Sequence, residues 1–212
     1  MRSPPRPPRF GLPFRAVRGK LAPRSTEVPM ADVVLFHSIL GPGPSEAALT
    51  RALTAAGHRV SAPDLFGGRS VQDYDAGFAL KDAIGDAVIL ERARAALAAA
   101  PADAVLAGVS FGGFRIGALW QPETPAALLI SGVAAWPEPP RPDLRLEAHV
   151  ARPDPFDDEE FFADWAATCQ GQAVLHRYDG AGHLFLDDRL PDYSAEAARL
   201  CLTRATAFLN SL

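Results

Sequence analysis

The sequence predicts an α/β protein with a mostly parallel sheet and helices on both of its faces. Short β-branched segments alternate with longer amphipathic segments along residues 30–212, and this alternation is typical of parallel βαβ units. With 48% hydrophobic and 22% charged residues, the chain of 212 residues suits one domain around one hydrophobic core. Ligands of such sheets bind beyond the carboxyl ends of the strands, so we expect functional residues in the strand-to-helix loops.

The expected elements begin at residue 31. Strands are predicted over 31–37, 58–63, 103–108, 126–131, 144–151 and 172–178. Helices are predicted over 45–57, 87–101, 111–120, 158–169 and 194–209. Ser45 can cap the first helix and Pro101 ends the second. Only 12 residues separate the fourth strand from the fifth, which is too short for a helical lid domain over the site.

Residues 1–29 differ in composition from the rest of the chain. They hold six Arg and one Lys against Glu27 alone, a net charge of +6, so residues 30–212 carry −10. Seven Pro in this segment predict a disordered basic tail, and no apolar run suits a secretory signal. The alternatives are an over-extended start upstream of Met30, or a tail for targeting or for binding an anionic surface. In each case residues 30–212 form a single domain.

Charge, hydropathy and cysteine spacing exclude several function classes. The acidic body offers no basic groove, so nucleic acid is not an expected partner. No run approaches the roughly 18 apolar residues of a membrane helix, so no membrane partner is expected. Cys169 and Cys201 have neither CxxC spacing nor paired His ligands, which predicts no metal site and a reduced, cytoplasmic protein.

The segment GVSFG, residues 108–112, matches the G-x-S-x-G nucleophile elbow. It lies between a predicted strand and a predicted helix, which is the context that this motif requires. Such a turn lifts the Ser110 hydroxyl clear of the sheet, and bulkier side chains in place of Gly108 or Gly112 would collide with neighbouring backbone. Ser110 is therefore the candidate nucleophile.

A histidine and a carboxylate follow in the order expected of an α/β-hydrolase, nucleophile then acid then histidine. His183 lies in the glycine-rich loop YDGAGHLF after the last strand. Asp154 is the first carboxylate after strand 144–151, and Asp157 and Asp158 are competitors that resemble helix caps. The other histidines, at positions 37, 58, 149 and 176, fall in or beside predicted strands, where structural roles are expected.

The same pattern predicts an oxyanion hole and part of a pocket. One backbone N–H would come from Phe111, directly after the nucleophile, and the other from the loop after the first strand, with Ile39 favoured over Ser38 or Leu40. The candidate pocket residues are Ser38, Leu40, Phe66, Trp136 and Leu184.

Five segments together resemble the dienelactone hydrolase family of the α/β-hydrolase superfamily. They are VVLFHSILG, SAPDLFGG, GVSFGG, HVARPDPF and YDGAGHLF, and the resemblance covers nearly all of 31–210. It implies an α/β-hydrolase fold without a lid and hydrolysis of small esters or lactones by Ser110, Asp154 and His183, with neither a metal nor an organic cofactor.

Three positions depart from the type enzymes of that family. Ser110 replaces their cysteine nucleophile, so the chain is more similar to a serine esterase branch. Asp187 stands where they bind the substrate carboxylate with arginine, and a negative charge there would repel an anionic substrate. Ser38 replaces the acidic residue of their oxyanion loop.

Two other functions compete with a serine hydrolase. A catalytically inactive protein of this fold could bind a ligand or regulate a partner, because a fold alone does not determine function. A thiol enzyme would need an accessible Cys169 or Cys201, yet both fall among apolar residues of predicted helices. We expect a small-molecule ester or lactone as the partner, and a monomer or a homodimer.

Overall fold

The protein is built on one parallel six-stranded sheet. The computed structural model describes residues 30–169 and 171–212, so the predictions for 1–29 lie outside the described residues. The strands are β1 Asp32–Phe36, β2 Arg59–Ser61, β3 Val105–Val109, β4 Ala126–Ile130, β5 Arg145–Arg152 and β6 Ala173–Asp179. Their order in the sheet is β2-β1-β3-β4-β5-β6, and every neighbouring pair is parallel. The predicted fold class is confirmed.

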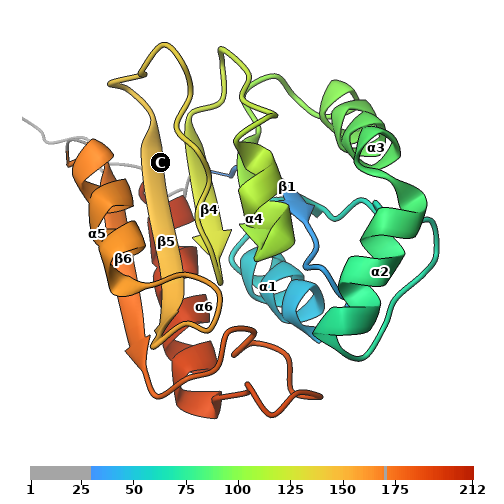
Figure 1. Ribbon diagram of the computed structural model, residues 1–212. Helices are drawn as coiled ribbons and strands as arrows, with labels where there is room; N and C mark the ends of the chain where they lie inside the picture. Colours follow the sequence, from blue (N-terminus) through green and yellow to red (C-terminus); the bar gives the residue numbers. More distant parts are fainter. Residues whose placement is uncertain (1–29, 170) are drawn as a thin grey trace, which may run out of the picture.

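Helices cover both faces of this sheet (Figure 1). They are α1 Pro44–Ala55, α2 Tyr74–Ile84, α3 Asp86–Ala98, α4 Phe111–Ile116, α5 Glu159–Thr168 and α6 Ala195–Leu209. In Figure 1, α4 and α5 lie in front of the strands, whereas α6 lies behind β5 and contacts α1. The central strands β3 and β4 are buried along their whole length, as expected for a parallel sheet that is covered on both faces.

Helix α2 was not predicted from the sequence. It begins after Asp73, whose side chain accepts a hydrogen bond from the backbone N–H of Ala76 at 2.8 Å, and it ends at Gly85. Only Gly77 of this helix is fully buried, whereas Tyr74, Leu80 and Ile84 are partly buried against the core. The helix matters because it forms one wall of the candidate site.

The segment between β4 and β5 contains no helix, which agrees with the predicted absence of a lid. Residues 131–144 are all described and connect the two strands by turns and irregular backbone. This segment therefore places no helix over the carboxyl ends of the strands. No helix in the described part of the chain has the length and hydropathy needed to span a membrane.

Candidate active site

Ser110 occupies a strained turn between β3 and α4. Its backbone has φ 49° and ψ −112°, a conformation that residues with side chains rarely adopt. A Cβ on Gly108 would lie 2.4 Å from the nitrogen of Gly113, and a Cβ on Gly112 would lie 2.3 Å from the carbonyl oxygen of Phe36. The two glycines thus allow the backbone contacts that hold the Ser110 hydroxyl above the strand ends.

His183 lies against the Ser110 hydroxyl. Its loop follows β6, and its Nε2 is 2.8 Å from the Oγ of Ser110. The imidazole packs edge-on against Phe156, with ring centroids 4.5 Å apart, and against Tyr74 at 6.1 Å. Tyr74 donates its hydroxyl hydrogen to Asp192 at 2.6 Å, so α2 is joined to the loop that carries His183. These contacts fix the orientation of the ring.

Asp154 is the carboxylate that pairs with this imidazole. Its Oδ2 lies 2.8 Å from the Nδ1 of His183, and its side chain is fully buried. Burial by itself raises the pKa of Asp154, but the hydrogen bonds from His183 and from the Phe156 amide outweigh it, so this pKa lies below its ordinary value. The carboxylate is therefore ionised at neutral pH and holds Nδ1 protonated.

The two competing carboxylates have other positions. Asp158 caps α5 by accepting a hydrogen bond from the backbone N–H of Phe161 at 2.8 Å, as its place before a helix predicted. Asp157 lines the cavity in front of Ser110, and burial followed by the charge of Asp154 raises its pKa. The structure thus brings Ser110, His183 and Asp154 together in one hydrogen-bonded chain.

The amides of Ile39 and Phe111 are available to a ligand. Both residues line the same cavity as Ser110, and neither backbone N–H has an acceptor among residues 30–169 and 171–212. Glu46 holds the Ile39 loop from behind, accepting hydrogen bonds from the amides of Ser38 and Gly43, each at 2.9 Å. Burial raises the pKa of this carboxyl. The loop is thereby fixed with the Ile39 amide left free.

A cavity of about 570 Å³ lies in front of Ser110. Six aromatic rings dominate its lining: Tyr74 and Phe78 on α2, Phe111 and Phe114 on α4, and Phe156 and Phe161 at and after the Asp154 loop. This volume falls within the range of small-molecule sites, and the apolar lining around a few polar groups is typical of them. None of Tyr74, Phe78, Phe156 and Phe161 was singled out from the sequence.

Contrary to the prediction from the sequence, the lining of this cavity contains none of the five expected pocket residues, which are Ser38, Leu40, Phe66, Trp136 and Leu184. Phe66 forms a second layer, because its ring lies 6.0 Å behind that of Phe111 and packs against His37. Trp136 packs against Trp165 of α5 instead. Ser38, Leu40 and Leu184 are buried in the core. Ser38 and Leu40 flank Ile39, and Leu184 directly follows His183, but these three side chains are buried away from the cavity.

Asp187, whose charge was expected to repel an anionic substrate, does not line the cavity. The carboxylate is buried outside the cavity lining and binds Arg189, with Oδ2 2.8 Å from Nη2 and Oδ1 3.0 Å from Nε. Its charge is therefore compensated within the loop and does not face a substrate in this cavity.

The comparisons with known proteins agree with this geometry. The family model described as "Dienelactone hydrolase family" matches residues 17–212. The chain belongs to the dienelactone hydrolase family. Membership supports the prediction that this family member is an ester or lactone hydrolase. No significant match was found among curated proteins.

Solved structures similar to this dienelactone hydrolase family member share its fold. A protein from Klebsiella pneumoniae subsp. pneumoniae assigned as a dienelactone hydrolase has 19% identity and a TM-score of 0.66, with 90% of each chain covered. A dienelactone hydrolase-like promiscuous phosphotriesterase from metagenomic libraries has 20% identity and a TM-score of 0.67, covering 87% of each chain. A Xanthomonas campestris protein assigned to the α/β hydrolase superfamily has 25% identity and a TM-score of 0.58, covering 86% of this chain and 99% of its own.

The cysteines of this family member are poorly placed for a thiol mechanism. Cys169 and Cys201 are both buried free thiols. Burial raises the pKa of Cys169 to about 12 and raises that of Cys201 as well. Neither lines the cavity at Ser110. A thiolate nucleophile at neutral pH is therefore not supported.

Proposed function

We propose that the protein hydrolyses small uncharged carboxylic esters or lactones, with Ser110 as the nucleophile, His183 as the general base and Asp154 as the group that orients the imidazole. The observation that carries this proposal is the chain of two 2.8 Å contacts from Ser110 through His183 to Asp154, at a cavity where two backbone amides lack acceptors. Ser110, His183 and Asp154 then act as a triad.

The reaction follows from this arrangement in two halves. The Oγ of Ser110 attacks the ester carbonyl carbon while its proton passes to the Nε2 of His183. The amides of Ile39 and Phe111 donate to the oxygen that becomes negative, an interaction worth about 2.7–4 kcal/mol per donor in comparable sites. His183 then returns the proton to the leaving alkoxide, and an acyl-enzyme remains. Water then attacks the acyl carbon while His183 takes its proton. The bond from that carbon to the Oγ of Ser110 breaks, His183 returns the proton to this oxygen, and the carboxylic acid leaves.

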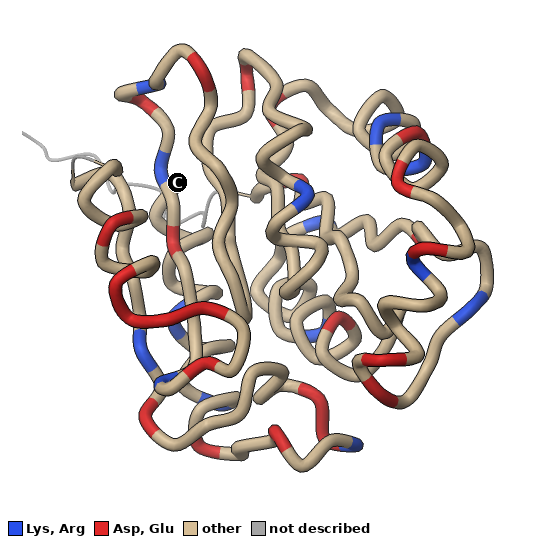
Figure 2. Tube along the Cα trace, in the orientation of Figure 1, with Lys and Arg blue, Asp and Glu red and all other residues tan. Residues whose placement is uncertain are grey.

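The charges around the cavity favour an uncharged substrate. Two cations line it, but Lys81 contacts Asp82 with 2.6 Å between Nζ and Oδ1, and Arg115 pairs with Asp86. The carboxylate of Asp157 also lines the cavity. Figure 2 shows acidic and basic residues at the ends of β5 and β6 and on the loops that follow them, where Asp179 pairs with Arg152 and Asp187 pairs with Arg189. An anionic substrate would meet no free cation among the described residues that line the cavity and would be repelled by Asp157, whereas a neutral ester would not.

A series of p-nitrophenyl esters tests both the activity and the apolar cavity. We expect the full-length chain to hydrolyse the acetate, butyrate and hexanoate with saturation kinetics. We also expect kcat/KM to rise with acyl length, by up to about fourfold for each methylene that the aromatic lining buries. Initial rates of p-nitrophenol release give these values.

Unfolded protein at the same concentration is the control. It shows how fast exposed nucleophilic side chains cleave these esters when no folded active site is present. Rates that stay linear in ester concentration and match this control would overturn the proposed activity. Saturation kinetics with a kcat/KM that does not rise with acyl length would still support esterase activity. That result would contradict the binding of the acyl chain in the aromatic cavity.

A further inference from the structure

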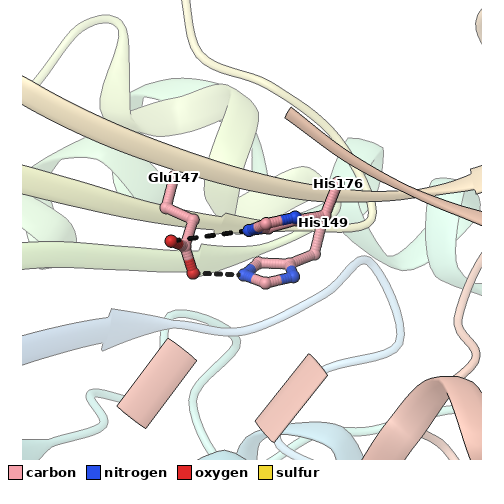
Figure 3. Close-up of side chains that lie close together, drawn as sticks. All are labelled: Glu147, His149 and His176. Carbon is pink, nitrogen blue, oxygen red and sulfur yellow. Dashed lines mark hydrogen bonds and ion pairs between the residues drawn. The ribbon is translucent and has the colours of Figure 1, made fainter. Parts of the chain in front are cut away.

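A second cluster of polar side chains lies between the sheet and α6. Glu147 and His149 come from β5, and His176 comes from β6 directly opposite His149 in the strand pairing. Side chains of alternate residues share a face of a strand, so all three point to the same side of the sheet. Figure 3 shows the Glu147 carboxylate reaching a nitrogen of each imidazole. Such a group is unusual where apolar packing is the rule.

The atoms of this cluster have the chemistry and spacing of metal ligands. The two carboxylate oxygens of Glu147 lie 2.9 Å from the Nε2 of His149 and 3.6 Å from the Nε2 of His176, and the three ligand atoms all lie within 4.8 Å of one another. Ligand atoms of a tetrahedral zinc ion, with bonds of about 2.0–2.2 Å, lie roughly 3.3–3.6 Å apart. Small movements of the three side chains would therefore bring their ligand atoms to the spacing of a tetrahedral zinc site.

We propose that Glu147, His149 and His176 bind a divalent transition-metal ion, with Zn²⁺ as the probe, at a site separate from the cavity of Ser110. Two imidazoles and one carboxylate are a donor set that zinc takes in proteins. None of the three residues lines the Ser110 cavity, so this metal has no part in the proposed ester hydrolysis. It would instead join β5 to the edge strand β6.

Surrounding residues hold one ligand and leave access for an ion. The Nδ1 of His149 lies 2.7 Å from the hydroxyl of Tyr178, an outer contact of the kind that orients metal-binding imidazoles. Glu147 and His176 border a second cavity, of about 550 Å³, through which an ion and a completing water can enter.

Two arginines line the same cavity as the proposed ion. Arg145 donates hydrogen bonds to Ser211, whereas the guanidinium of Arg204 on α6 lies 5.6 Å from the centre of the Tyr178 ring. The three ligands carry a single negative charge, so a bound divalent ion leaves a net positive charge near this arginine. Replacement of Arg204 by glutamine should therefore tighten binding severalfold. A cluster that serves only as a hydrogen-bonded network gives no such response.

Zinc titration of chelator-treated, full-length protein tests the proposal. We expect one Zn²⁺ per chain by calorimetry, and a thermal midpoint that rises by about 5–10 °C at a zinc concentration a hundredfold above Kd. Co²⁺ at the same site should give the visible absorption of tetrahedral cobalt. His176→Ala and Glu147→Gln should each lose these signals, and Arg204→Gln should strengthen them.

The matched control is His183→Ala, which removes the imidazole of the Ser110 site and leaves Glu147, His149 and His176 unchanged. This variant should keep the ion. Loss of zinc from His183→Ala, with retention by His176→Ala and Glu147→Gln, would overturn the proposal and place the ion at the other site. Wild-type protein that takes up no zinc and shows an unchanged midpoint would overturn it in favour of hydrogen bonding alone. Circular dichroism identifies any variant that is unfolded, and Glu147→Gln preserves the side-chain shape.

Discussion

Ser110→Ala is expected to lower kcat for p-nitrophenyl acetate by a factor on the order of 10⁴ to 10⁶. The substitution removes the Oγ that lies 2.8 Å from the Nε2 of His183, so neither attack by this oxygen on the ester nor an acyl-enzyme on it can occur. In comparable triads the loss of the serine costs about as much as the loss of the whole triad, and the residual rate comes from binding and the oxyanion hole. Steady-state rates of the purified full-length proteins measure the ratio.

Ser61→Ala is the matched control for this experiment. Ser61 is an exposed residue at the end of β2, the opposite edge of the sheet from β6, and its substitution should leave kcat unchanged. Thermal unfolding of both variants checks that folding is intact. Equal rates for Ser110→Ala and the wild type would refute the assignment of the nucleophile. If the rates of Ser110→Ala and of the wild type are also no faster than the rate of unfolded protein, a ligand-binding role for the cavity is the better interpretation.

Asp154→Asn is expected to lower kcat by a factor on the order of 10³ to 10⁴. The carboxylate accepts the Nδ1 hydrogen of His183 at 2.8 Å and so keeps Nε2 free to take the proton of Ser110. An amide nitrogen facing Nδ1 favours the other tautomer, in which Nε2 carries the hydrogen and the base is lost. Because the pKa of Asp154 lies below its ordinary value, the wild-type carboxylate stays ionised and the ratio should hold between about pH 6 and 8.

Asp157→Asn separates this effect from a general loss of negative charge. Asp157 lies three residues further along the same loop and lines the cavity, but the imidazole pairs with Asp154. We expect less than about a tenfold change in kcat from this control, because no triad contact is removed. Similar losses from Asp154→Asn and Asp157→Asn would contradict the role given to Asp154.

The fold and the Ser110 site could be predicted because their signals are local in sequence. Alternating strand and helix patterns define the sheet, and the glycines around Ser110 are required by a turn in which a Cβ would overlap backbone atoms. Chain order then limits the acid and the histidine to a few positions. Asp154 follows β5 and His183 follows β6, and these two strands are parallel neighbours, so the fold itself brings the two residues together.

The cavity lining could not be predicted in the same way. Proximity in sequence to Ser110 or His183 does not say which side chains point outward, and Leu184 turns into the core although it directly follows His183. The aromatic wall that Phe78 supplies was missed because residues 74–84 were not predicted to form a helix, so no side chain of α2 could be placed beside Ser110. The cluster of Glu147, His149 and His176 was missed because the register between β5 and β6 places His176 beside His149, and no spacing along the chain encodes that register.

The most direct test of the proposed chemistry is to locate a covalent label from a fluorophosphonate, which reacts with activated serines. Active full-length protein should lose esterase activity as it takes up one phosphonyl group per chain. Peptide mass spectrometry should place that group on Ser110, and Asp154→Asn should label far more slowly. Complete loss of activity with the label on another residue, or full activity in protein labelled at Ser110, would contradict the proposal that Ser110 is the nucleophile.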